Sequence, residues 1–304
     1  MIIVGAGLSG LIAAHSFPKA QVVEANQAVE SHKALLRFRS KAVSDLVGVP
    51  FQEVTVRKGI FFRGSFRPVN VALANCYARK CLGSLVGDRS IWNQEPAQRF
   101  IAPEDLYAEL VDNLGTRVAW ESPFDYADQL RWRPKDSYIN TAPLPVALKS
   151  LGIEAPEGTS FNRAGITVRR WRIPGANVFQ TIYFPDPEHS LYRASITGDM
   201  LIAEFMESGP DHAEWRVDLQ SAFAINLLDA EAIGEFTQRY GKIAPIHDGT
   251  RRAMLHDLSV KYGIYSLGRF ATWRNILLDD LINDIDVVKK LMRNDDYSGR
   301  ITRK

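Results

Sequence analysis

The first 24 residues contain a glycine pattern that strongly restricts how this chain can fold. A short apolar run, Ile2 to Val4, leads directly into Gly5-Ala6-Gly7-Leu8-Ser9-Gly10, and a stretch of helical character follows to about His15. A second apolar run then ends at Glu24, about 20 residues after the first glycine. Strand, glycines, helix, strand and acid in this order predict a βαβ unit of the dinucleotide-binding type.

Each glycine of the pattern has a physical role in such a unit. Gly5 permits the tight turn, Gly7 lets a pyrophosphate approach the backbone, and Gly10 lets the helix lie close to the strand. The helix N-terminus then faces the phosphates, and Glu24 is placed to accept hydrogen bonds from a ribose. The alternative is a glycine-rich turn that binds no ligand. The candidate dinucleotide-binding residues are Gly5, Gly7, Leu8, Ser9, Gly10 and Glu24.

The charge balance argues against a dedicated nucleic-acid-binding protein. The 304 residues include 37 lysines and arginines and 35 acids, which gives a formal charge of +2. Dedicated nucleic-acid binders are more basic, so nucleic acid could bind only through a local patch. The basic and aromatic stretch from Arg37 to Arg67 could hold a polyanion, but a half-exposed hairpin produces the same pattern. We expect the hairpin, and we interpret Arg169 to Arg172 in the same way.

Neither a metal site nor a membrane contact is predicted. Cys76 and Cys81 are not part of a Cys/His set with zinc spacing, and the six histidines also lack ligand spacing. We interpret both cysteines as reduced thiols, and we therefore expect a cytoplasmic protein. The apolar start, Met1 to Ala14, has no basic region before it, unlike a signal peptide. No later stretch reaches the roughly 18 apolar residues of a membrane span.

The remaining pattern predicts an α/β protein in which a Rossmann-like domain carries a smaller antiparallel-sheet region. Alternation on both sides of Lys58-Gly59 predicts a hairpin. The β-branched and aromatic stretches 166–184 and 192–205 predict two or more antiparallel strands, joined by the turn Pro185-Asp186-Pro187. Helices are expected at 69–83, 103–114, 222–239 and 277–292, and further strands at 117–120, 138–145 and 264–267.

Four separated segments resemble the flavoproteins of the UDP-galactopyranose mutase and amine oxidase type. They are the glycine fingerprint, Tyr138 to Leu144 (YINTAPL), Ile182 to Ile196 (IYFPDPEHSLYRASI) and Leu267 to Asp279 (LGRFATWRNILLD). Their order along the chain is the order of that family. The resemblance implies FAD as the cofactor, and the lack of a second GxGxxG for a nicotinamide cofactor agrees with it.

The resemblance also implies roles for residues beyond the fingerprint. Thr141 would lie beside the flavin dinucleotide, and Gly268 and Arg269 would return the chain to the flavin; the alternative for Arg269 is a helix-capping charge. Arg193 would bind an anionic group of the substrate, because its planar guanidinium suits phosphate or carboxylate. The alternative is a strand arginine on a solvated face. The candidate substrate-binding residues are Arg193, Trp273 and Asn275.

Departures from the family pattern bear on the reaction. Mutases carry a histidine-bearing loop against the flavin, and the nearest equivalent here, Leu36 to Ser40, has no histidine. Asn275 replaces a tyrosine that contacts the sugar-nucleotide diphosphate, and Leu277 replaces an acid. We therefore expect FAD-dependent oxidation of a small amine or similar group on an anionic substrate, nucleotide-linked and nucleic-acid-linked substrates included. The alternatives are a mutase that uses reduced FAD on a nucleotide sugar, and a non-catalytic flavin-binding partner module.

The expected FAD-binding domain is discontinuous. It consists of residues 1–45, 115–160 and 255–293. Residues 46–114 and 161–254 form the substrate region, and residues 294–304 form a polar tail. No catalytic side chain is predicted, because oxidation by a flavin needs no side-chain nucleophile.

Overall fold

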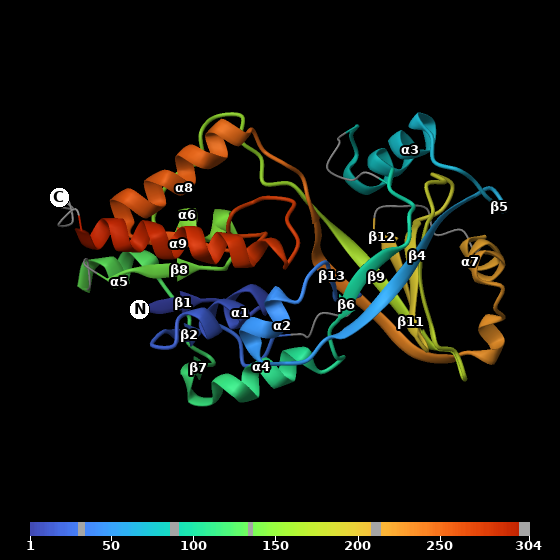
Figure 1. Cartoon of the computed structure of the whole chain (residues 1–304). Helices are drawn as coiled ribbons and strands as arrows, with labels where there is room; N and C mark the ends of the chain where they lie inside the picture. The colour runs from blue at the N-terminus through green and yellow to red at the C-terminus, as the bar shows by residue number, and fades with distance from the viewer. Residues whose placement is uncertain (30–33, 86–90, 133–135, 208–213, 298–304) are drawn as a thin grey trace.

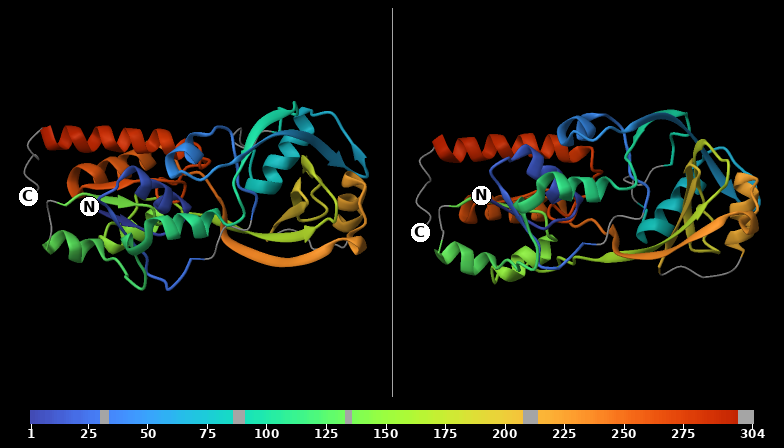
Figure 2. Two further views of the ribbon diagram at one scale, coloured as in Figure 1. Left: turned by 60° about the horizontal axis from the view of Figure 1, so that its bottom comes forward. Right: turned by 90° about the horizontal axis from the view of Figure 1, so that it is seen from below.

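The computed structural model describes residues 1–29, 34–85, 91–132, 136–207 and 214–297. Within these ranges the chain forms two lobes, and each lobe is built on its own β-sheet (Figure 1). The two lobes lie end to end, as two further views show (Figure 2).

The smaller sheet has five parallel strands in the order β14-β8-β1-β2-β7. Ile3 in the central strand pairs with Val22 on one side and with Ile139 on the other, so segments far apart in the sequence meet here. The predicted Rossmann-like α/β class is therefore confirmed. The strands are β1 (Ile2–Val4), β2 (Gln21–Val23), β7 (Val118–Ala119), β8 (Tyr138–Asn140) and β14 (Ile264–Ser266).

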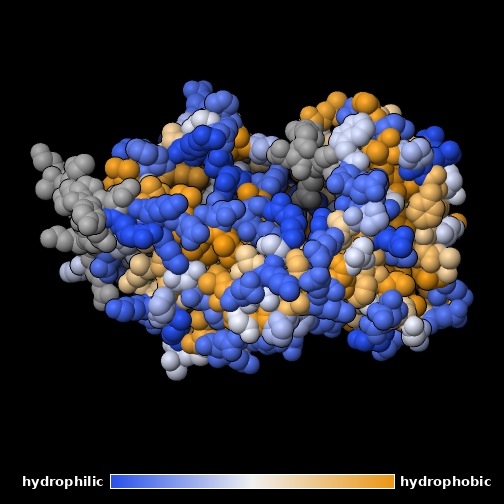
Figure 3. Space-filling model, viewed as in Figure 1, coloured by the Kyte–Doolittle hydropathy of each residue, from blue (hydrophilic) through white to orange (hydrophobic). Residues whose placement is uncertain are grey.

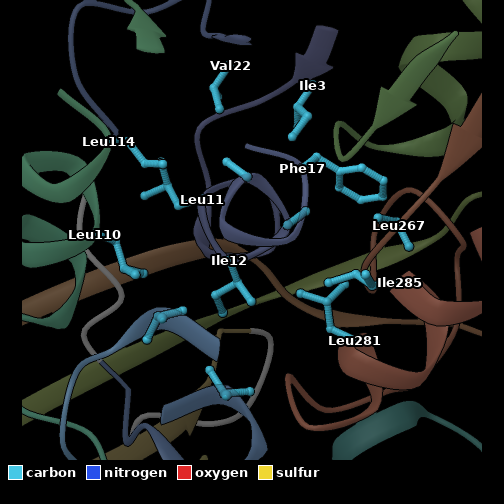
Figure 4. Packing of buried hydrophobic residues seen from close by; sticks show 14 of the residues in the cluster. Ile3, Leu11, Ile12, Phe17, Val22, Leu110, Leu114, Leu267, Leu281 and Ile285 are labelled. Atoms are coloured by element: carbon cyan, nitrogen blue, oxygen red, sulfur yellow. The ribbon is translucent and has the colours of Figure 1, made fainter. Parts of the chain in front are cut away.

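Helices cover both faces of the parallel sheet. One face packs against α1 (Leu8–Ser16), α2 (Ala42–Val47), α4 (Leu106–Leu114) and α9 (Asp280–Tyr297). The other face packs against α5 (Tyr126–Trp132), α6 (Leu144–Ser150) and α8 (Asp248–Tyr262). Figure 4 shows side chains from β1, β2, α4 and the C-terminal segment gathered around α1, whose Leu11 and Ile12 are fully buried. This packing fixes the position of the N-terminus of α1.

The larger sheet has nine strands, and eight of them follow the order β13-β9-β12-β11-β10-β4-β6-β3. Neighbouring described strands are antiparallel, apart from β4 and β10, which run parallel. The expected antiparallel region is thus confirmed and has more strands than the pattern required. The strands are β3 (Arg37–Phe38), β4 (Gln52–Phe62), β5 (Ser65–Phe66), β6 (Ala97–Ile101), β9 (Arg163–Arg172), β10 (Val178–Tyr183), β11 (Leu191–Gly198), β12 (Met200–Met206) and β13 (Glu231–Ile243).

The two faces of the larger sheet differ in chemistry. One face is apolar and packs against α7 (Trp215–Phe223) through residues such as Ile196 and Phe205. The opposite face meets α3 (Val71–Leu82) through a second apolar cluster, but it also carries Arg193 and Glu204. On the outside, hydrophilic residues cover much of the molecule, and hydrophobic residues reach the surface in patches on both lobes (Figure 3).

The hairpin predicted around Lys58-Gly59 is wrong, because β4 continues through both residues. The chain reverses later, at Arg63 and Gly64, which both have positive φ angles. Gly59 has a packing role instead: a Cβ atom there would lie 3.0 Å from the ring of Phe66, which folds back over it from β5. The glycine thus makes room for a ring rather than for a turn.

The helix predicted over 222–239 is also wrong. Helix α7 ends at Phe223, and residues 231–243 form the edge strand β13 along β9. A Cβ atom at Gly241 would lie 2.6 Å from the side chain of Ile166 in β9, so the two strands come unusually close there. Pairing with a distant strand overrides the local helical pattern.

The expected domain bounds assign two elements, α4 and β3, to the wrong lobe. Helix α4 falls within residues 46–114 but packs against α1 beside the parallel sheet. Strand β3 falls within residues 1–45 but belongs to the larger sheet. The polar tail is expected from residue 294, but helix α9 continues through Tyr297. Residues 298–304 lie outside the described residues, and the domain bounds remain a prediction.

Candidate functional site

The turn between β1 and α1 has the conformation that its glycines require. Gly5 has a φ angle of +101°, which strains any residue with a Cβ atom. A Cβ atom at Gly10 would lie 2.0 Å from the Gly5 carbonyl oxygen. The Thr141 hydroxyl holds the same turn from β8, because it donates to the Val4 carbonyl oxygen at 2.8 Å. Gly5, Gly10 and Thr141 therefore fix the start of α1.

Gly7 differs from its neighbours because none of the described residues crowds it. Its φ angle of −69° suits any residue, and a Cβ atom there would have no heavy atom of these residues within 4 Å. Gly7 caps α1, whose first backbone N–H groups, those of Leu8, Ser9 and Gly10 among them, have no acceptor within the helix. The helix N-terminus thus opens onto free space with donors and a positive partial charge, which favours an anionic ligand.

Glu24 lies at the end of β2, beside this helix N-terminus. Its side chain is buried, and its carboxylate accepts hydrogen bonds from the Ala6 N–H at 2.9 Å and from the Asn26 N–H at 3.1 Å. The Asn26 side-chain amide donates to it as well, at 2.8 Å. These contacts hold the carboxylate next to the glycine turn, where the fingerprint places the ribose acid.

Two residues beside Glu24 carry no sequence signal that would single them out. The Tyr107 hydroxyl on α4 donates to the Ala6 carbonyl oxygen at 2.9 Å, and Asn26 orients the carboxylate as described. Burial raises the pKa of Tyr107 to about 12, and the Glu24 carboxylate adds to this shift. Tyr107 therefore stays a neutral donor that supports the turn.

The C-terminal segment returns to the fingerprint, as the resemblance implies. Gly268 has a φ angle of +86°, and a Cβ atom there would lie 2.4 Å from the Ser9 hydroxyl oxygen. Arg269 follows at once, half-buried, with its guanidinium 5.6 Å from the ring centre of Phe270. Gly268 and Arg269 thus begin a turn beside the N-terminus of α1.

The same C-terminal segment also binds Leu36 to Ser40, the stretch that corresponds to the histidine-bearing loop of the mutases. The Asp279 carboxylate accepts the backbone N–H groups of Arg39 at 2.8 Å and of Ser40 at 3.2 Å. The Arg39 guanidinium pairs with Asp280 at 2.5 Å. One segment therefore links the glycine turn in the smaller lobe to β3 of the larger sheet.

Arg193 lies on the polar face of the larger sheet, where a buried carboxylate meets it. Its guanidinium donates to both oxygens of Glu204, at 2.6 and 2.7 Å. Tyr192 donates to Glu204 as well, and the Lys242 ammonium donates to the Tyr192 hydroxyl at 3.0 Å. Burial alone would raise the pKa of Glu204, but the positive charges of Arg193 and Lys242 outweigh it and lower the pKa to about 2.

Arg37 also reaches this face, although its sequence pattern did not single it out. Its guanidinium donates to the Thr181 hydroxyl at 2.6 Å and to the Thr197 hydroxyl at 3.2 Å. Burial lowers the pKa of Arg37 to about 10, and the positive charge of Arg193 adds to this shift. Two arginines from distant parts of the chain therefore lie close together on one face of the sheet.

The two remaining candidate substrate residues have different surroundings. Trp273 is 1% exposed, its ring packs edge-on against Phe161, and its indole N–H donates to the Ala244 carbonyl oxygen at 3.0 Å. The observed packing gives Trp273 a role in the core. Asn275 is half-buried, and both polar atoms of its amide lack a hydrogen-bond partner among the described residues.

Neither a metal site nor a membrane-spanning helix is found where the chain is described. No three His, Cys, Asp or Glu side chains of the described ranges are grouped so that they could hold a metal ion. Every helix in these ranges is too short or too polar to cross a membrane.

Solved structures of flavin-dependent and related enzymes share this fold. A structure of reduced UDP-galactopyranose mutase matches with a TM-score of 0.68 at 15% sequence identity, over 96% of this chain and 95% of that chain. A double mutant of putrescine oxidase matches with a TM-score of 0.52 at 12% identity, over 96% and 98% of the two chains. A complex of aklavinone-11 hydroxylase with FAD and aklavinone matches with a TM-score of 0.50 at 13% identity, over 89% and 56%.

The likeness to the mutase and amine oxidase type is therefore confirmed at the level of the fold. No protein-family model matches the sequence, and no curated protein matches it either.

Proposed function

We propose that this chain is a flavoenzyme that binds FAD at the N-terminus of α1. The observation that carries this proposal is the open space at Gly7, because Gly5 and Gly10 beside it and Gly268 in the neighbouring C-terminal turn are all tightly packed. A pyrophosphate group would occupy that space, next to the free N–H groups of the helix. The fold match to a solved FAD complex supports FAD as the dinucleotide.

The residues of the structure fit such a cofactor. Gly7 leaves the approach to the backbone open, and Glu24 holds a carboxylate at the position of the ribose acid. Gly268 and Arg269 bring a second turn to the same place, with Ser9 between the two turns. Thr141 has a supporting role in this proposal, because its hydroxyl is used within the glycine turn.

The reaction we propose is oxidation of a small amine or similar group on an anionic substrate. When bound, FAD accepts the two electrons that leave the oxidised bond. The protein supplies the position of the substrate, and Arg193 on the polar face of the larger sheet is the proposed anchor. Nucleotide-linked and nucleic-acid-linked substrates both fit this description. A reaction of this kind needs no side-chain nucleophile, which agrees with a site rich in arginine and hydroxyl groups.

A mutase reaction on a nucleotide sugar is the second candidate, and one observation favours it. The match to UDP-galactopyranose mutase has a TM-score of 0.68, against 0.52 for putrescine oxidase. Two residues argue against the mutase reaction. The stretch from Leu36 to Ser40 lacks the histidine of the mutases, and its Arg37 bonds to the larger sheet. Asn275 occupies the position at which mutases have a tyrosine. A non-catalytic flavin-binding module is the third candidate.

Anaerobic spectroscopy separates these candidates. The protein is loaded with FAD, and candidate amines are added without oxygen. Bleaching of the flavin bands by an amine supports the oxidation. In a parallel sample the flavin is reduced with dithionite and given UDP-galactopyranose. Formation of UDP-galactofuranose in that sample would replace the proposed oxidation by the mutase reaction, and a protein that takes up no flavin would contradict both.

A further inference from the structure

The peptide groups on both sides of Ala6 are held by side chains from different elements. The Ala6 N–H, which belongs to the peptide group of Gly5 and Ala6, donates to the Glu24 carboxylate at 2.9 Å. The Ala6 carbonyl oxygen, which belongs to the next peptide group, accepts the Tyr107 hydroxyl at 2.9 Å. Ala6 itself is fully buried. Two consecutive peptide planes of the glycine turn therefore each have an anchor outside the turn.

The position of the Tyr107 hydroxyl is set by a helix that is packed into the core. Leu106 and Leu110 of α4 are fully buried, and α4 lies against α1. Tyr107 is half-buried and packs against the same core cluster. A group on a packed helix is held more precisely than a group on a loop. The hydroxyl thus gives the Ala6 carbonyl oxygen a partner in a fixed place.

The geometry of the peptide bond carries this effect to Gly7. The Ala6 carbonyl and the Gly7 N–H belong to one planar trans peptide group, in which the C=O and the N–H point in opposite directions. Because Tyr107 holds the carbonyl oxygen on the side of α4, the Gly7 N–H points away from Tyr107. The Gly7 carbonyl oxygen accepts the Leu11 N–H at 3.0 Å, so the following peptide group already belongs to α1. The direction of the Gly7 N–H therefore depends on the Tyr107 hydroxyl.

We propose that Tyr107 is a positioning residue of the dinucleotide site, which directs the Gly7 N–H toward the pyrophosphate of the bound molecule. That this pyrophosphate belongs to FAD rests on the proposed function, whereas ADP tests the site without the flavin. A Cβ atom at Gly7 would meet none of the described residues within 4 Å, so a ligand has room to approach the backbone there. A backbone N–H that is oriented before the ligand arrives loses little freedom on binding, which strengthens the binding of an anion. Burial raises the pKa of Tyr107 to about 12, so the hydroxyl remains a donor throughout the neutral range.

A hydrogen bond that merely satisfies a buried carbonyl would have different consequences. Its loss would lower the stability of the fold and would affect every ligand of the site alike. A bond that directs the Gly7 N–H affects ligands with a phosphate group at that position. Adenosine and ADP share the base and the ribose and differ in the diphosphate, so the two ligands separate the two roles.

Calorimetry on the flavin-free, full-length protein tests the positioning role. FAD, ADP and adenosine are titrated into the parent protein, into Tyr107→Phe and into a control variant. Tyr107→Phe should weaken FAD and ADP binding by about 3- to 10-fold, the range for one neutral hydrogen bond, and should change adenosine binding by less than about twofold. Ser44→Ala is the matched control, because the Ser44 hydroxyl also donates to a backbone carbonyl, that of Val49 at 2.7 Å, at the end of α2. This control should leave all three affinities unchanged.

Nuclear magnetic resonance of the glycine N–H groups provides a second measurement. The protein contains 21 glycines, and isotopic labelling of glycine alone makes their N–H signals visible. The Gly7 signal is identified by its loss in Gly7→Ala. In the parent protein ADP should shift this signal downfield and adenosine should not, and Tyr107→Phe should reduce the response to ADP. A Gly7 signal that ADP leaves unmoved overturns the proposal, even if Tyr107→Phe fails to fold.

The titrations keep the positioning role apart from the flavoenzyme proposal. The positioning role is overturned if Tyr107→Phe binds ADP as tightly as the parent does, or if it loses adenosine affinity by the same factor as ADP affinity. A parent protein that binds FAD, with a Tyr107→Phe variant that binds FAD and ADP equally tightly, keeps the flavoenzyme and removes the positioning role. A parent protein that binds ADP but no FAD, and loses ADP affinity in Tyr107→Phe, does the reverse. A parent protein that binds neither contradicts both.

Discussion

Gly268 lies so close to Ser9 that a Cβ atom at position 268 would fall 2.4 Å from the Ser9 hydroxyl oxygen and 2.7 Å from its Cβ atom. This contact joins the C-terminal segment to the first turn of α1, and it leaves Gly7 open on the same turn. The two ends of the sequence thus build one end of the proposed cofactor site. Changes at this contact should affect both the fold and the binding of FAD.

Gly268→Ala should destabilise the protein more than an ordinary glycine replacement. Gly175→Ala is the matched control, because Gly175 also has a positive φ angle, +75°, but has open space around it. The control should cost about 1 kcal/mol for the left-handed conformation alone. Gly268→Ala should cost about 1 to 3 kcal/mol more because of the contact with Ser9. Denaturant unfolding measures both values, and equal losses would contradict the close packing.

Gly7→Val and Gly10→Ala should separate ligand binding from folding. A Cβ atom at position 7 meets no atom of the described residues within 4 Å and the backbone there suits any residue, so Gly7→Val should keep the unfolding free energy within about 0.5 kcal/mol of the parent value. It should nevertheless lose FAD, because the side chain fills the space for the pyrophosphate. Gly10→Ala should unfold or be strongly destabilised. If Gly7→Val kept full FAD occupancy, the dinucleotide site would lie elsewhere.

Replacement of Glu24 tests the ribose contact. Glu24→Ala should weaken FAD binding by about 1.5 to 3 kcal/mol, the range for hydrogen bonds to a charged group. It also removes the acceptor of the Ala6 N–H, so Glu24→Gln, which keeps one oxygen acceptor there, is the proper comparison. The amide variant should be more stable than the alanine variant and still bind FAD less tightly than the parent. Unchanged FAD affinity in both variants would leave Glu24 a structural role only.

The ion pair of Arg193 and Glu204 should make stability fall in acid. The pKa of Glu204 is about 2 in the folded protein, below its ordinary value of 4.5. Its contribution is therefore fully present above about pH 4.5 and is lost as the pH falls toward 2, by about 3 kcal/mol in total. Glu204→Gln should lower the stability at neutral pH and flatten the curve between pH 5 and 3. Parallel curves for the variant and the parent would contradict the low pKa.

Local chemistry explains what could be predicted from the sequence. The roles of Gly5 and Gly10 follow from the geometry of one turn, and the structure places both as that turn requires. The parallel sheet was predictable because short apolar strands alternate with helical patterns. The antiparallel region was predictable from its β-branched and aromatic stretches, although Gly59 was misinterpreted as a turn residue because its contact with Phe66 is invisible in the strand pattern.

Long-range contacts explain what could not be predicted. Arg37 bonds to Thr181 and Thr197, which lie 144 and 160 residues later in the chain. No local pattern distinguishes it from the exposed arginines of the same segment. Strand β13 depends in the same way on pairing with β9. Trp273 follows the family motif in the sequence, but its surroundings in the core depend on Phe161 and Ala244, which only the folded chain brings together.

The most direct test of the central claim is the visible spectrum after reconstitution with FAD. The purified protein and its Gly7→Val variant are each incubated with FAD and passed through a desalting column, and their spectra are compared. The parent protein should retain the two absorption bands of oxidised flavin in close to equimolar amount, and the variant should emerge folded but colourless. A colourless parent protein, or a variant that retains as much flavin as the parent, would contradict an FAD site at the N-terminus of α1.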